Sequence, residues 1–103
     1  MKYYPDIFII RVTYVSGKEE TLGYFFDKEE AFDVVSKAQT ILEYLQNLKY
    51  DYFPLAGTVE VLLPGIMNSS VKRMLGLVCG TVLVKNIKHF GAYQNISLEE
   101  EKL

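Results

Sequence analysis

The spacing of apolar residues changes at Asp27, and this change constrains the fold more than any other feature of the sequence. Before Asp27, residues 7–15 and 20–26 form two runs rich in β-branched and aromatic residues, with the alternation typical of strands. Residues 16–18 separate the two runs and contain a glycine suited to a tight turn. The two runs therefore predict a β-hairpin.

A long helix is predicted directly after the hairpin. Asp27 and Glu30 have the spacing at which each side chain can accept a hydrogen bond from an unpaired amide of the first turn. Apolar residues then recur every three or four positions and share one stripe: Ala31, Val34, Val35, Ala38, Ile41, Leu42, Leu45 and Leu48. The opposite, polar face carries Glu29, Glu30, Asp33, Lys37, Gln39, Glu43 and Gln46. On that face, Asp33 and Lys37 are spaced for an i to i+4 ion pair.

The chain after this helix predicts further strands. Pro54 disfavours helical angles at the preceding residue, so the helix that begins at residue 28 ends between residues 47 and 53. Residues 58–63 alternate and predict a third strand. Residues 77–88, rich in Val and Leu, predict one long or bent strand with Gly80 as a bulge.

A second, short helix is predicted between these strands. Asn68, Ser69 or Ser70 is a candidate N-cap for a helix through residues 74 and 75, and Gly76 is its natural left-handed stop. The order of elements predicts an α+β fold. We expect a single small, mostly antiparallel sheet of about four strands, with the long amphipathic helix packed on one face and a second short helix.

The composition predicts a folded chain with a covered surface. Of the 103 residues, 50% are hydrophobic and the net charge is only −2, which excludes intrinsic disorder. We expect residues 1–96 to form a single compact domain and residues 97–103 a charged, frayed tail. Because a domain of this size buries only about 60 to 70% of the surface of its unfolded chain, we expect part of the apolar surplus to face a partner.

The sequence lacks the residue combinations of common enzymes and metal sites. Cys79 and His89 are the only cysteine and histidine, and on one continuous strand they would lie about 33 Å apart. One of each falls short of the three or four ligands that zinc prefers, and the glycines match no phosphate-binding loop. We therefore expect no enzyme activity, no cofactor and no metal. A carboxylate enzyme that uses a buried Glu60 ranks third among the hypotheses.

The absence of disulfide pairs and of long apolar runs bears on location. A single cysteine cannot form an internal disulfide, and the longest apolar stretch is well short of the roughly 20 residues of a membrane span. No secretory signal is visible at the start of the chain. We expect a cytoplasmic protein without membrane contact.

Aromatic residues gather at the end of the long helix and suggest a contact surface. Tyrosine combines a large apolar ring with a polar tip and little side-chain entropy, which suits protein interfaces. The predicted protein-contact residues are Tyr44, Tyr50, Tyr52 and Phe53. The favoured function is a non-catalytic protein–protein interaction module of the regulatory, adaptor or virus-encoded inhibitor type, which self-associates as a homodimer or homo-oligomer.

The alternative function is weak nucleic-acid binding. Acidic residues are absent between residues 61 and 98, so the cations there could form a basic surface with aromatic rings for base stacking. The candidate residues are Lys72, Arg73, Lys85, Lys88, Phe90 and Tyr93. Because the chain has a pI of about 5.4, such binding would be weak and strongly salt-dependent.

Overall fold

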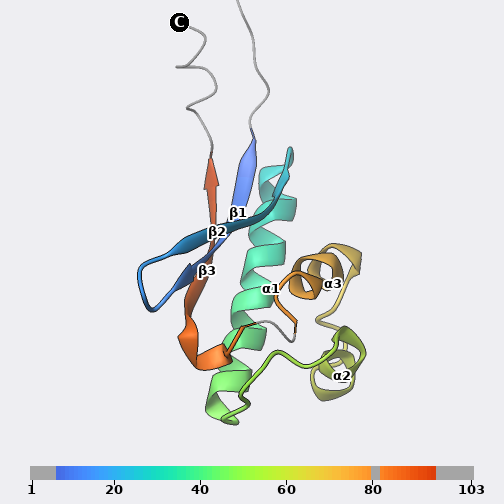
Figure 1. The fold of residues 1–103 in the computed structure, drawn as a ribbon. Helices are drawn as coiled ribbons and strands as arrows, with labels where there is room; N and C mark the ends of the chain where they lie inside the picture. The colour runs from blue at the N-terminus through green and yellow to red at the C-terminus, as the bar shows by residue number, and fades with distance from the viewer. Residues whose placement is uncertain (1–6, 80–81, 95–103) are drawn as a thin grey trace, which may run out of the picture.

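The computed structural model describes residues 7–79 and 82–94. Its elements, in chain order, are β1 (Phe8–Tyr14), β2 (Glu19–Phe25), α1 (Lys28–Asn47), α2 (Ala56–Leu62), α3 (Ser69–Gly76), the 3-10 turn η1 (Val84–Asn86) and β3 (Ile87–Gln94). The strands form one antiparallel sheet in the order β2-β1-β3, and α1 runs along one face of it (Figure 1). The predicted α+β fold is confirmed, with three strands instead of about four and two short helices instead of one.

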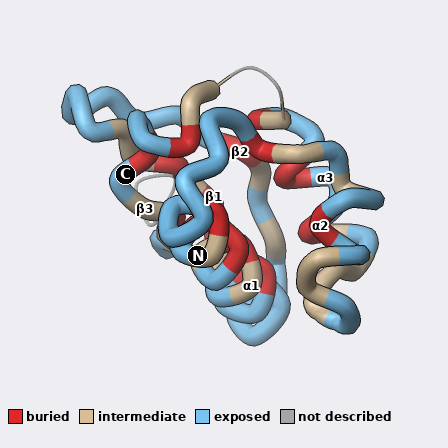
Figure 2. The backbone as a smooth tube through the Cα atoms, turned by 90° about the horizontal axis from the view of Figure 1, so that it is seen from below, coloured by how far each residue is buried: buried red, intermediate tan, exposed pale blue. Residues whose placement is uncertain are grey.

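The hydrophobic core lies between the sheet and the helices. Phe8, Ile10 and Val12 are buried on the face of β1 that meets α1. The buried stripe of α1 consists of Ala31, Val34, Ala38, Ile41, Leu42 and Leu45, as its spacing predicts. Figure 2 shows buried positions along α1, β1 and the inner sides of α2 and α3. Burying each large aliphatic side chain contributes roughly 1.5–3 kcal/mol, so this layer stabilises most of the fold.

Two bulges adjust the sheet. Between β1 and β2 the register shifts after the Ile10 pair, which leaves Leu22 as the extra residue of β2. Leu22 is buried in the core cluster, so the bulge turns its side chain toward the helices. Between β1 and β3 the register shifts after the Thr13 pair, and there Lys88 is the extra residue.

Helix α1 also covers the outer edge of β3. The Gln39 side-chain oxygen accepts a hydrogen bond from the Phe90 amide at 3.0 Å. Gln46 donates from Nε2 to the carbonyl oxygens of Ile87 and Val84, at 3.2 and 3.4 Å. The Phe90 amide and the Ile87 carbonyl at the outer edge of β3 are thus satisfied by side chains of the helix.

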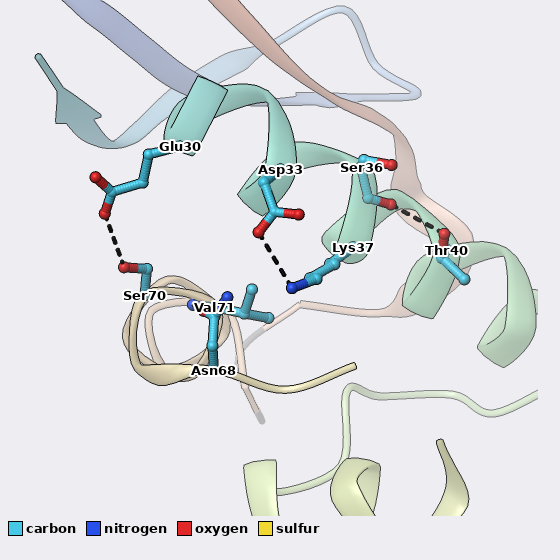
Figure 3. Close-up of polar contacts among 8 residues, drawn as sticks. All are labelled: Glu30, Asp33, Ser36, Lys37, Thr40, Asn68, Ser70 and Val71. Atoms are coloured by element: carbon cyan, nitrogen blue, oxygen red, sulfur yellow. Dashed lines mark hydrogen bonds and ion pairs between the residues drawn. The ribbon is translucent and has the colours of Figure 1, made fainter. Parts of the chain in front are cut away.

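The helix caps follow the sequence closely. The Asp27 carboxylate accepts from the Glu29 amide at 3.2 Å and caps α1, as predicted. Asn68 caps α3 by accepting from the Val71 amide at 2.9 Å. The Glu30 carboxylate, predicted to accept from an amide of the first turn, instead accepts from the hydroxyl of Ser70 on α3, at 3.4 Å (Figure 3). The predicted pair of Asp33 and Lys37 is also present, with 3.1 Å between Oδ2 and Nζ (Figure 3).

The predicted strand at residues 58–63 is wrong, because residues 58–62 lie within helix α2 and Leu63 is its C-cap. The amides of Thr58 and Val59 both donate to the Leu55 carbonyl, and Leu63 donates to the Val59 carbonyl. Val59, Leu62 and Leu63 fit a helical spacing, whereas Val59, Val61 and Leu63 fit an alternating one, and a run this short does not distinguish the two. Only Val59 of this helix is buried.

The predicted strand at residues 77–88 is also wrong. This segment begins with a turn after α3, includes η1, and enters β3 only at Ile87. Val78 and Val84 of this segment are buried in the core although they lie outside any strand, whereas Leu77 is 54% exposed. Gly76 is not left-handed, so it is not the expected stop of α3. Gly80 and the predicted tail at residues 97–103 lie outside the described residues.

Candidate functional site

The predicted aromatic cluster follows a well-defined helix end. The Lys49 amide donates to the Gln46 carbonyl and the Tyr50 amide donates to the Leu45 carbonyl, which together form a Schellman motif. Lys49 is the left-handed residue of this motif, with φ of 60°. This tight end of α1 sets the direction in which Tyr50 and the residues after it leave the helix.

The structure separates the four residues of the cluster by burial. Tyr50 and Tyr52 are 41% and 50% exposed, whereas Tyr44 is half-buried on α1. Phe53 is 3% exposed and packs edge-to-face on Phe90, with 6.0 Å between the ring centroids. Tyr50 and Tyr52 are therefore available to a partner, and Phe53 serves the core.

The exposed tyrosines stand on an anchored segment. The Val84 amide donates to the Asp51 carbonyl at 2.7 Å, and Tyr52 forms an isolated antiparallel bridge with Leu83. Lys49, Tyr50 and Asp51 line a shallow hollow together with Lys85 of η1. The segment thus presents its side chains from a backbone tied to the rest of the fold.

The predicted nucleic-acid residues do not form one surface. Nζ of Lys72 lies 3.5 Å from the carboxylate of Glu60, which offsets its charge. Arg73 lines a hollow between β2 and α3, whereas Lys85 lines the different hollow beside the end of α1. Lys88 is exposed at the bulge of β3.

The two aromatic residues of the nucleic-acid set lie in different environments. Phe90 is 4% exposed and points into the core, so its ring is not accessible to a base. Tyr93 is 41% exposed and lies on the opposite face of the sheet. Only Tyr93 of the pair could stack on a ligand.

The residues with chemical potential are dispersed. Among residues 7–79 and 82–94, no three His, Cys, Asp or Glu side chains come together as a possible metal site. The Cys79 thiol donates to the Pro54 carbonyl at 3.1 Å, and burial raises its pKa, which keeps it protonated and weakly nucleophilic. The Glu60 side chain is 48% exposed, so it lacks the burial that a carboxylate acid catalyst would need. No helix in the described part of the chain is long and apolar enough to cross a membrane.

The sheet face opposite α1 carries an exposed aromatic surface that the sequence analysis missed. The residues of β1 that point there alternate with the core residues and include Ile9 and Arg11. Their neighbours across the sheet are Tyr24 on β2 and Tyr93 on β3. We call this surface the open sheet face and define it by Ile9, Arg11, Tyr24, Phe26 and Tyr93.

Side-chain contacts hold the open sheet face in a fixed arrangement. The Tyr93 ring lies back along β3 over Gly91, where an added Cβ would come within 2.7 Å of the Tyr93 hydroxyl. The Arg11 guanidinium lies 5.9 Å from the centroid of the same ring, a cation–π geometry. Tyr24 and Phe26 meet edge-to-face at 6.0 Å and are 60% and 65% exposed. Gly91 is thus required for the position of Tyr93.

Comparison with known proteins gives no indication of function, so the surfaces described above are the basis for a proposal. No protein-family model, curated protein or solved structure matches the chain.

Proposed function

We propose that this chain is a non-catalytic protein-binding module that self-associates through the open sheet face. The observation that carries this proposal is an ordered aromatic surface with no described element packed on it. The occupant we propose is a second copy of the chain. Two sheets that pack face to face, about 10 Å apart, bury such surfaces in β-sandwiches.

The distribution of polarity on the sheet favours this contact. The aromatic end, formed by Tyr24, Phe26 and Tyr93, is apolar, whereas Glu19 and Thr13 near the hairpin turn are polar. Interfaces commonly combine an apolar centre rich in Tyr, Phe and Arg with a polar rim. The apolar surplus of the composition supports the same conclusion, since aromatic rings remain exposed after the core is complete.

The proposal is tested with paired charge substitutions and sedimentation velocity. Tyr24→Lys with Phe26→Lys places like charges in the proposed interface, and we expect it to raise the dimer dissociation constant at least tenfold. Tyr50→Lys with Tyr52→Lys is the matched control at the end of α1, and we expect it to leave the dimer intact. Thermal melts check that both variants fold. A wild-type chain that sediments as a monomer at all concentrations, or a dimer lost only in the control, would overturn the proposal.

Weak nucleic-acid binding is the alternative proposal, with less support. The ammonium group of Lys72 is already paired with the Glu60 carboxylate, and the Phe90 ring is buried. Retardation of labelled RNA at about 20 mM salt that disappears as salt rises would favour it. Absence of retardation at that salt concentration would remove it.

A further inference from the structure

The outer edge of β2 presents backbone groups with no partner in the described chain. The Phe90 amide donates to Gln39 and so points away from β1. Along a strand, the backbone groups of successive residues point alternately toward its two sides. The pairing of β1 with β3 and with β2 therefore identifies the residues of β2 whose backbone groups point away from β1. These outward residues are Glu19, Thr21 and Tyr24. No hydrogen bond joins their outward amides or carbonyls to another described residue.

A groove runs along this edge between β2 and α3. It is lined by Ile10, Leu22, Gly23, Tyr24, Phe25, Ser70, Arg73, Met74 and Leu77, and we call it the β2–α3 groove. Its floor is apolar, since Ile10 and Met74 belong to the core. Its rim is mixed, with Leu77 54% exposed and Arg73 exposed on α3.

The helical wall of the groove is fixed in place. Asn68 caps the first turn of α3, and the hydroxyl of Ser70 donates to the Glu30 carboxylate of α1 (Figure 3). Val71 and Leu75 are fully buried on the other side of α3. The spacing between α3 and β2 is therefore set by the fold, which gives a ligand a preformed site.

The groove has an uncompensated positive charge at its rim. Lys72, the neighbour of Arg73 on α3, pairs with the Glu60 carboxylate. Arg73 has no ion-pair partner among the described residues. A ligand carboxylate near Arg73 would supply one, and a guanidinium binds a carboxylate through two parallel hydrogen bonds.

We propose that the β2–α3 groove binds an extended acidic peptide segment of a partner protein, which adds to the outer edge of β2 as a fourth strand. Its backbone pairs with the outward amide and carbonyl of Tyr24, beyond the bulge. One apolar side chain enters the groove between β2 and α3, and an acidic side chain reaches Arg73. Because side chains two positions apart share a face of a strand, the expected pattern is an apolar residue separated from an acidic residue by one position.

Two features of β2 restrict where the peptide pairs. The bulge at Leu22 interrupts a regular ladder in the middle of the strand. Glu19 and Glu20 at the start of the strand repel an acidic peptide there. The end of β2 at residues 23–25, beside the groove, is left as the favourable position, and the same features oppose indiscriminate pairing of edges.

The experiment is a selection from a phage-displayed library of random nonapeptides against the full chain. We expect enrichment of peptides with the apolar and acidic spacing given above. A synthetic peptide of the most enriched sequence is then titrated by calorimetry. Arg73→Glu should weaken its binding at least tenfold and, in a repeated selection, change the preferred residue from acidic to basic. Lys72→Glu is the matched control on the same helix and should change the affinity less than threefold.

Hydrogen exchange identifies the bound edge. Peptide binding should slow exchange of the Tyr24 amide at least tenfold and leave the Phe90 amide unchanged. The proposal is overturned by a selection without enrichment, by equal binding to the Arg73→Glu chain, or by protection confined to other residues. Arg73 lies away from the open sheet face, so its substitution should leave sedimentation unchanged. Failure of the peptide site is thereby separated from failure of the proposed self-association.

Discussion

The two edges of the sheet differ in how their outward backbone groups are satisfied. On β3, Gln39 and Gln46 of α1 supply an acceptor and a donor. The seven steps from Gln39 to Gln46 rise about 10.5 Å along the helix, and the three steps from Ile87 to Phe90 span about 10 Å along the strand, so the spacings match. On β2 the outward backbone groups of Glu19, Thr21 and Tyr24 form no hydrogen bond with another described residue. One helix that crosses a three-stranded sheet protects a single edge, and the other edge becomes available for recognition.

The largest effect that tests this comparison comes from replacing one aromatic residue on each edge strand. Phe90→Ala on β3 should lower the free energy of unfolding by roughly 3–5 kcal/mol, because a buried aromatic ring that contacts Phe53 is removed. Tyr24→Ala on β2 should change it by less than about 0.5 kcal/mol, since its ring is mostly exposed. Urea denaturation measures both values. Equal losses would mean that both edges are integral to the fold.

A smaller effect is expected from the glutamine that caps β3. Gln39→Ala leaves the Phe90 amide without its acceptor and should cost about 1–2 kcal/mol. Exchange of the Phe90 amide should accelerate in the same variant. Gln39 also donates to the Glu43 carboxylate, so Glu43→Ala is the control and should cost only a few tenths of a kcal/mol. Unaltered exchange at Phe90 would show that α1 does not protect this edge.

A stabilising substitution at the end of α1 should change the free energy of unfolding by as much as Gln39→Ala or less. Lys49 occupies a left-handed position where a residue with a Cβ is strained, so Lys49→Gly should raise the free energy of unfolding by up to about 1 kcal/mol. Lys49→Ala keeps the Cβ and should be close to neutral. A decrease in stability for the glycine variant, measured by thermal melting, would contradict the Schellman end described for this helix.

The smallest effect concerns the hairpin that carries β2. Burial, followed by the charge and hydrogen bond of Glu20, raises the pKa of Tyr14 above 10.0. The folded state therefore favours the protonated phenol, and this contribution to stability is fully present below pH about 10 and is lost as pH rises through the folded pKa. Spectroscopic titration of the tyrosines should show one group titrating late, and Tyr14→Phe should remove it. An unchanged titration in that variant would assign the late group elsewhere.

The sequence predicted the elements whose determinants are local. The hairpin and α1 follow from alternation, the turn and the Asp27 cap, all within a few residues of one another. Segments 58–63 and 77–88 were misassigned because short apolar runs fit either period, and tertiary contacts decide between them. The sequence analysis assigned Gln39 and Gln46 to the polar face of the helix, because nothing near them in the sequence indicates that β3 packs beside them.

The candidate surfaces were only partly accessible to prediction. Tyr50 and Tyr52 are exposed, as a contact role requires, whereas the burial of Phe53 depends on the distant Phe90 ring. The open sheet face was missed because the start of β1 is apolar on both sides, so its alternation does not show which side the helix covers. The β2–α3 groove is formed by segments far apart in the chain, and the sequence of neither segment shows that the two lie side by side.

The position of β1 at the centre of the sheet has a consequence for folding kinetics. Its two neighbours are the next strand in the chain and the last described strand, with three helices in between. Closure of the long connection costs entropy before the β1–β3 pairs form, which slows folding relative to a helical protein of equal size. Until β3 arrives, an early intermediate with the hairpin and α1 would expose one side of the central strand to intermolecular pairing, and this species is the one most prone to aggregate.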